Sequence, residues 1–203
     1  MLNLPKSTEL NKQLTKKAIY AKFQMSPAAK AKFDTDISRI NIVGEISPNT
    51  TGIAQGQTVS SIFVLQVVLK QRNFQQSTIA QISKLIDQNM LLVLDCGTDR
   101  KLAIYHSKLI QTEWGSADAC VIALKGLDLD SVWENFITQV GGITIQQGNT
   151  LDQQIASDEQ QAKLEKEIAR LEKLARAEKQ PKKKFEIVQQ IKELELQLPG
   201  GHL

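Results

Sequence analysis

The run SSIFVLQVVLK, residues 60–70, is the clearest structural signal in this sequence. Most of its residues are apolar, and most of those are β-branched or aromatic. Such side chains lose rotamer freedom in a helix, so the run favours a β-strand. Because its apolar residues do not alternate with polar ones, both faces of that strand are expected to be covered. We therefore predict a central strand of a sheet, with other elements packed on both sides.

Two further segments supply neighbours for this central strand. Residues 78–87 carry isoleucine and leucine at helical spacing, and residues 90–96 form a second apolar run. A strand, a helix and a strand in this order predict a parallel pair. Gly97 then begins a turn, and residues 102–106 read as the return strand of a β-hairpin.

The segments on the amino-terminal side are predicted as two helices and a strand. Ser7 is a candidate cap for a short helix over residues 8–17. Ser26-Pro27 is typical of a helix start, and the apolar stripe that follows predicts a helix over residues 28–40. Residues 42–46 read as a strand.

The segments after the β-hairpin are predicted as edge strands and one helix. Residues 110–114, which begin with Ile and end with Trp, and the apolar run at residues 120–124 offer one or two further edge strands. Ser131 and Glu134 have the spacing of a capping box, and the helix that they begin is expected to end near Gly141.

The pattern changes from residue 150 onwards. Glycine is absent until Gly200, and charged residues of both signs are interspersed. Two apolar seams with 4-3-4 spacing are separated by Pro181, which a helix interior does not accommodate. The seams consist of Leu164, Ile168, Leu171 and Ala175, and then of Ile187, Ile191, Leu194 and Leu198. We predict a coiled-coil-like antiparallel helical hairpin.

These patterns together predict an α+β fold in two domains. Residues 1–149 are expected to form a mixed sheet of about five strands with flanking helices and a basic amino-terminal segment, and residues 150–203 the hairpin. Isolated helices of this length are marginal in water, so each seam must close on the other arm, on the α/β domain or on a second subunit. The predicted interaction residues are therefore those of the seam, namely Leu164, Ile168, Leu171, Ile187, Ile191 and Leu194.

Positive charge is concentrated in two places. Residues 1–40 hold eight Lys or Arg and three Asp or Glu, a net charge of +5, whereas the whole chain carries +3. The second place is the hairpin tip, where lysines stand at the beginning of a helix. The helix dipole does not stabilise cations at that position. The tip is a candidate contact for phosphate or for an acidic partner, with a solvated helix end as the alternative. Its residues are Arg176, Lys179, Lys182, Lys183 and Lys184.

The composition of the chain indicates its cellular compartment and whether it uses a metal or a cofactor. The two cysteines, Cys96 and Cys120, have no partner at zinc-ligand spacing. No apolar stretch approaches the ~20 residues that a membrane-spanning helix needs. The first residues lack the apolar segment of a signal peptide. We therefore expect a cytoplasmic protein that uses no metal and no cofactor and that does not enter a membrane.

Catalytic motifs are weak in this sequence. It holds no dinucleotide-binding, P-loop or zinc-protease motif, and His106 has no acid near it in sequence. A metal-dependent nuclease core is the one catalytic alternative, with Glu45, Asp95 and Lys70 as its candidate residues. Val68 stands where such a core needs an acid. An inactive, DNA-binding descendant of a nuclease is therefore part of the same alternative.

Three segments together carry a family pattern. They are LPKSTELNK at residues 4–12, ISPNT at residues 46–50 and EKQPKKK at residues 178–184. They resemble the family catalogued as domain of unknown function 4391, over most of the chain. Members of that family occur in bacteria and archaea, often encoded beside helicases and DNA methyltransferases. The resemblance implies an accessory role near DNA processing and supplies no catalytic residues.

We therefore expect a non-enzymatic interaction module. Its hairpin would dock a larger helicase or methyltransferase of a restriction-modification or phage-defence system. A homodimer is the alternative partner. Nucleic acid is a further candidate ligand, both for the hairpin tip and for the amino-terminal lysines Lys12, Lys16, Lys17 and Lys22.

Overall fold

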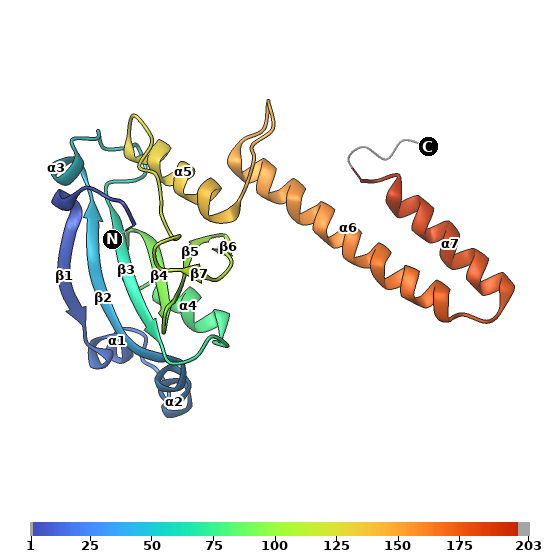
Figure 1. Cartoon of the computed structure of the whole chain (residues 1–203), viewed down its shortest axis with the longest axis horizontal. Helices are drawn as coiled ribbons and strands as arrows, with labels where there is room; N and C mark the ends of the chain where they lie inside the picture. The colour runs from blue at the N-terminus through green and yellow to red at the C-terminus, as the bar shows by residue number, and fades with distance from the viewer. Residues whose placement is uncertain (1, 199–203) are drawn as a thin grey trace. The chain divides into compact units, whose positions relative to one another are not determined.

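In the computed structural model, which describes residues 2–198, the chain forms two units, Met1–Ile143 and Thr144–Leu203 (Figure 1). The first unit holds a β-sheet with helices packed on it, and the second holds two helices. The predicted α+β class is confirmed. Each helix of the described residues is either too short or too polar to cross a bilayer.

The first unit is built on a seven-stranded mixed sheet. The strands lie in the order β1-β2-β3-β4-β5-β6, and β7 pairs with β5. The predicted central run forms β3, which lies between β2 and β4. The strands are β1 (Glu9–Leu14), β2 (Ile37–Ile46), β3 (Ile62–Leu69), β4 (Asn89–Cys96), β5 (Asp99–His106), β6 (Lys108–Gln111) and β7 (Gly115–Ser116).

The pairing of β3, β4 and β5 confirms the strand order predicted from the sequence. β3 and β4 are parallel, with Leu65 opposite Leu92, and α4 (Gln76–Ile82) lies in the connection between them. β4 and β5 are antiparallel and form a hairpin. Its turn contains Gly97, whose φ of 62° is a conformation that glycine adopts without strain.

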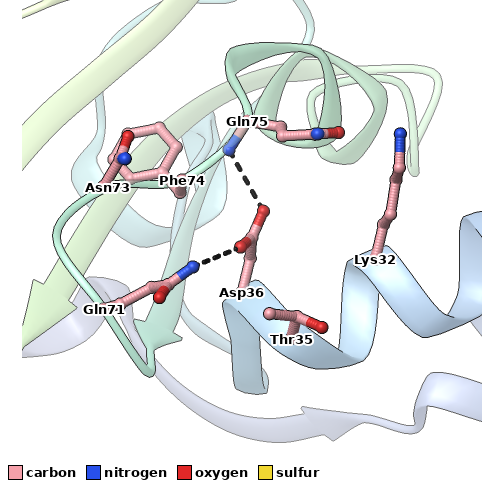
Figure 2. A pocket seen from close by; sticks show the side chains of 7 residues that line it. All are labelled: Lys32, Thr35, Asp36, Gln71, Asn73, Phe74 and Gln75. Atoms are coloured by element: carbon pink, nitrogen blue, oxygen red, sulfur yellow. Dashed lines mark hydrogen bonds between the residues drawn. The ribbon is translucent and has the colours of Figure 1, made fainter.

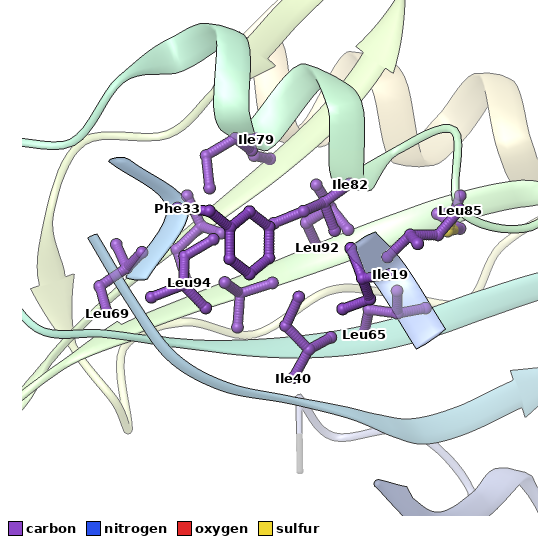
Figure 3. Packing of buried hydrophobic residues seen from close by; sticks show 14 of the residues in the cluster. Ile19, Phe33, Ile40, Leu65, Leu69, Ile79, Ile82, Leu85, Leu92 and Leu94 are labelled. Atoms are coloured by element: carbon purple, nitrogen blue, oxygen red, sulfur yellow. The ribbon is translucent and has the colours of Figure 1, made fainter. Parts of the chain in front are cut away.

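One face of the sheet is covered by α4 and by two amino-terminal helices, α1 (Lys16–Lys22) and α2 (Pro27–Asp36). Figure 3 shows Ile19, Phe33 and Ile79 from these helices packed over Leu65 and Leu92 of the sheet. All five side chains are almost completely buried. Each such burial contributes roughly 1.5–3 kcal/mol of hydrophobic free energy.

The opposite face of the sheet is also buried. Because side chains alternate along a strand, Ile62, Val64, Leu91 and Val93 point away from the first cluster, and all four are almost inaccessible to solvent. The helix α5 (Leu129–Gly141) packs against β5 and β6. The central strands are therefore covered on both faces, as their continuous apolar sequence predicts.

Two helix predictions on the amino-terminal side are wrong. The segment 8–17 is mostly the edge strand β1, which follows a short 3-10 turn η1 (Lys6–Thr8). The helix expected over 28–40 ends at Asp36, and Ile37 and Ile40 belong to β2. A β-bulge near residue 38 shifts the register, so these two isoleucines, three residues apart, both reach the core. The bulge therefore gives the buried residues of this strand the three-residue spacing that is typical of a helix.

Two further predictions are corrected before residue 143. Residues 120–124 form no strand, and the backbone N–H of Ile122 donates to the carbonyl of Leu2 (3.2 Å). The cap of α5 is Asp128 rather than Ser131, because the Ser131 N–H and Oγ both donate to Asp128 Oδ1 (2.8 and 2.7 Å). A short helix α3 (Pro48–Thr51) occupies part of the connection between β2 and β3.

The second unit is the predicted helical hairpin. α6 (Leu151–Ala177) begins at a capping box between Thr150 and Gln153. α7 (Pro181–Glu195) begins at Pro181, a position where the missing N–H has no cost. Three residues connect the helices, and α7 folds back along α6 (Figure 1).

Candidate functional site

The predicted seam residues lie between the two helices of the hairpin. Ile168, Leu171, Ala175 and Ile191 form a buried cluster, and the half-buried Ile187, Leu194 and Leu198 pack against it. Leu164 is half-buried on α6. The seam therefore closes on the other arm, which is one of the three expected ways to cover it. Its side chains stabilise the hairpin, so a partner would have to contact other residues.

A second set of apolar residues on the hairpin stays exposed. Phe185 of α7 is 63% exposed, and Leu196, the capping residue directly after α7, is 55% exposed. Eleven residues are close to three helical turns, so these two side chains share one face of the helix, with Val188 beside them. We call Phe185, Val188 and Leu196 the outer face of α7. Leu174 of α6 is also exposed.

The basic hairpin tip adjoins the outer face of α7. Lys182, Lys183 and Lys184 occupy the first turn of α7, are exposed, and form no ion pair within residues 2–198. Arg176 pairs with Glu172 at 3.2 Å on the surface of α6. Because these three lysines form no ion pair, the tip has positive charge that the described residues do not neutralise, and the helix dipole does not favour cations at this position.

Two of the four predicted amino-terminal lysines, Lys16 and Lys22, are engaged within the first unit, whereas Lys12 and Lys17 are exposed. Lys16 Nζ donates to Asp34 Oδ1 and to the carbonyl of Ile37, both at 2.6 Å. The bond from Lys16 is the largest factor that lowers the pKa of Asp34. Lys22 Nζ donates to the carbonyl of Leu85 (2.5 Å). These two lysines connect elements of the first unit.

The three candidate nuclease residues are not brought together. Glu45 pairs with Phe63 near the beginning of β3, whereas Lys70 follows the end of that strand. An extended strand rises ~3.3 Å per residue, which places Glu45 and Lys70 roughly 20 Å apart. Lys70 Nζ donates to the carbonyl of Asp34 (2.5 Å). Among residues 2–198 there is no group of three or more His, Cys, Asp or Glu arranged to hold a metal ion.

Asp95 belongs to a polar network that crosses four strands. Asn41 Nδ2 donates to Gln66 Oε1 (3.0 Å), and Gln66 Nε2 donates to Asp95 Oδ2 (2.7 Å). Arg100 binds both oxygens of Asp95, at 2.6 and 3.0 Å, and this bond raises the pKa of Arg100. Burial raises the pKa of the nearby Cys120 thiol. The network is satisfied within itself, so it fixes strand register rather than exposing a reactive group.

A hollow of about 420 Å³ lies at the end of α2 (Figure 2). Asp36, which is 5% exposed, forms its floor. The carboxylate accepts hydrogen bonds from Gln71 Nε2 (3.0 Å) and from the backbone N–H of Gln75 (3.1 Å). Asn73, Phe74, Lys32 and Thr35 complete the lining.

A larger hollow of about 690 Å³ lies beside the beginning of β4 and has a mainly polar lining. Its two lysines are already engaged, since Lys22 binds a carbonyl and Lys84 Nζ lies 5.2 Å from the ring centre of Tyr105. Asp87 adds a negative charge to the same lining. This hollow therefore has two cations that are already engaged by neutral groups, and its described lining has no buried acid comparable to Asp36.

Comparison with known proteins identifies the family. Residues 2–198 match the family described as Domain of unknown function (DUF4391). The chain belongs to this family. No curated protein matches it, and no solved structure matches it. The DUF4391 match thus confirms the resemblance seen in the sequence, and it extends through both units of the chain.

Sequence reasoning missed the Asp36 hollow of this DUF4391 chain. Asp36 reads as a solvated charge on a helix, and Gln71 and Gln75 lie 35 and 39 residues away from it. The available signal was the position of Asp36 directly before the buried Ile37. It was not enough to indicate a pocket.

Proposed function

We propose that this protein is a non-enzymatic accessory module that docks a larger protein through its helical hairpin. The observation that supports the proposal is the outer face of α7. The seam residues of the two helices pack against each other, yet Phe185 and Leu196 stay more than half exposed. Large apolar side chains exposed together beside charged ones are typical of interaction surfaces.

The chemistry of this surface defines the partner. Phe185 is flanked by the tip lysines, which form no ion pair within residues 2–198, and Lys192 lies on the same helix face between Val188 and Leu196. A complementary partner would offer an apolar pocket for Phe185 with Asp or Glu around it. We propose a helicase or DNA methyltransferase of a restriction-modification or phage-defence system as that partner, in the cytoplasm. This choice rests on the neighbourhood that the family resemblance implies.

The test begins with capture of binding proteins from the native host by the full chain, followed by mass spectrometry. The captured helicase or methyltransferase is then purified and titrated calorimetrically. We expect Phe185→Ala to weaken its affinity by about tenfold or more, because truncation of an aromatic anchor costs ~2 kcal/mol. Replacing Lys182, Lys183 and Lys184 by Ala should slow association, with a reduced dependence on salt.

Matched controls separate the surface from general effects. Replacing Lys163, Lys166 and Lys173 by Ala removes the same charge from exposed positions of α6. Leu127→Ala removes an apolar side chain that is 92% exposed in the first unit. Both control variants should bind as the unmodified chain does. Unchanged affinity after Phe185→Ala and after the triple change at the tip would refute the proposal.

Two other occupants of the surface give different results. A dimer seen by sedimentation that dissociates after Phe185→Ala would assign the outer face to a second copy. Binding of DNA that is lost on removal of the tip lysines but kept in Phe185→Ala would assign the tip to phosphate. Either result would overturn the partner proposal.

The nuclease-like alternative is checked with the same preparation. Magnesium-dependent cleavage of DNA that is lost in Glu45→Ala would support it. We rank it second, because Glu45 of β2 lies opposite the beginning of β3, Lys70 follows the end of β3, and Asp95 is bound to Arg100.

A further inference from the structure

We propose that the hollow at Asp36 is a binding site for a guanidinium group. All the residues that line it belong to the first unit. No residue of the hairpin lines it, so its occupant is distinct from the partner proposed for the outer face of α7. Three features of the lining support this assignment, and a fourth, Lys32, opposes it and provides a further test.

The first feature is a buried carboxylate that forms no ion pair within the described residues. Asp36 is 5% exposed, and both of its hydrogen bonds come from neutral donors. No Lys or Arg within residues 2–198 forms an ion pair with it. A carboxylate removed from water is costly unless a cation compensates it. A cation that enters the hollow would supply this compensation.

The second feature is the free acceptor capacity of the carboxylate. An ionised Asp side chain has about four lone-pair sites, and Gln71 and Gln75 use one on each oxygen. One site is left on each oxygen. Two parallel N–H groups of a guanidinium match this arrangement better than the point charge of an ammonium.

The third feature is the rest of the wall, which offers amides and an aromatic ring. The Nε2–H of Gln71 donates to Asp36, so the Oε1 of the same amide does not take part in that hydrogen bond. Asn73 provides a second amide in the lining (Figure 2). The Phe74 ring is held edge-to-face by Trp114, with centroids 6.4 Å apart. A planar cation gains from amide oxygens at its edge and from an aromatic face.

The fourth feature is Lys32, the one cation in the lining. It lies one turn before Asp36 on α2 and is exposed at the rim. A bound guanidinium would be repelled by this ammonium. The site therefore predicts opposite effects for the two charged residues: loss of Asp36 weakens binding, and loss of Lys32 strengthens it.

The experiment titrates the full chain with acetyl-arginine-amide by calorimetry, and with the neutral isostere acetyl-citrulline-amide. We expect one site for the arginine probe and no binding of the citrulline probe. Asp36→Asn should weaken the arginine probe by about tenfold to a hundredfold, as expected for the loss of charged hydrogen bonds. Lys32→Gln should strengthen it about twofold to fivefold, the size of an exposed charge effect.

Controls keep the test independent of folding. Asp87→Asn removes an exposed acid from the same unit and should leave binding unchanged. Should Asp36→Asn fail to fold, Phe74→Leu provides the second variant, and it should weaken binding several-fold through loss of the ring. Equal binding of the citrulline probe, or unchanged affinity in Asp36→Asn, would overturn the assignment.

A last comparison separates the two sources of a guanidinium. Tighter binding of the pentapeptide Gly-Gly-Arg-Gly-Gly than of agmatine would assign the site to an arginine side chain of a protein. Tighter binding of agmatine would assign it to a small molecule. Failure of both compounds to bind would refute the site.

Discussion

The two units bury their apolar residues in different geometries. In the first unit the central strands carry helices on one face and are buried on the other, so Leu65 and Leu92 are surrounded on all sides. In the hairpin each helix contacts the other along a single stripe, and the buried cluster centres on Leu171 and Ile191. A residue enclosed on all sides loses more apolar surface to water than one in a single seam.

Because of this difference, the two units are expected to have different free energies of unfolding. Opening free energies vary across a structure, and regions with few buried contacts open first. The chain allows this to be observed, because its two tryptophans, Trp114 and Trp133, both lie in the first unit. Tryptophan fluorescence therefore reports the sheet, whereas helical circular dichroism includes the hairpin.

The largest expected effect is a cavity in the sheet core. Phe33 is 1% exposed and packs against the sheet under α4. Phe33→Ala should lower the free energy of unfolding of the first unit by about 3–5 kcal/mol, because the space is not refilled. Urea unfolding followed by tryptophan fluorescence measures this loss. Leu127→Ala, at a 92% exposed position, should change it by less than ~0.5 kcal/mol.

A smaller effect is expected in the hairpin seam. Leu171→Ala removes a side chain at the centre of the seam and should lower the local stability of the hairpin by about 2 kcal/mol. The circular dichroism transition should move to lower urea while the fluorescence transition stays in place. Leu174→Ala, an exposed leucine on the same helix, is the matched control. Transitions that coincide and shift together would show that the two units unfold as one.

Low pH should lower the stability of each unit through a different carboxylate, Asp130 in the first unit and Glu167 in the hairpin. Asp130 accepts from the backbone N–H groups of Gln57 and Val59 and from the Thr58 hydroxyl, and the hydroxyl bond is the main cause of its lowered pKa. A carboxyl with a lowered folded pKa stabilises the fold above its unfolded value of about 3.8. That contribution is lost as the pH falls through the folded pKa.

The measurement is the urea midpoint by fluorescence between about pH 2 and 5. Asp130→Asn should flatten its dependence on pH. Glu167 is the matched residue in the hairpin, since the side chain of Arg170 lowers its pKa in the same direction. Glu167→Gln should leave the fluorescence midpoint unchanged, because no tryptophan reports on that unit. An equal response of both variants would contradict separate unfolding.

The smallest expected effect is at high pH. Burial and the hydrogen bond from Tyr20 Oη to Asp34 (2.6 Å) raise the pKa of Tyr20 to about 12. The protonated phenol therefore stabilises the fold below the unfolded pKa of about 10, and this contribution is lost as the pH rises through 12. Tyr20→Phe should remove a phenolate absorbance phase near pH 12. Asp34→Asn should move that phase to lower pH, and an unmoved phase would contradict the role of the carboxylate.

Several elements were predictable from the sequence alone because their signals are local. The apolar run of β3, the glycine turn between β4 and β5, and Pro181 between two seams each specify one structure within a few residues. The bulge in β2 was not predictable. It places Ile37 and Ile40 on one face, and that spacing reads as a helix until the partner strand is known.

The candidate sites divide in the same way. The basic tip is visible as consecutive lysines, whereas the exposure of Phe185 depends on which stripe of α7 faces α6. The hollow at Asp36 needs residues from α2 and from the segment after β3, and these meet only when the sheet pairs. Periodicity, turns and charge runs depend on neighbours along the chain and can be read from residue order. Strand register, burial of a charge and the lining of a pocket depend on neighbours across space, which only the folded chain brings together.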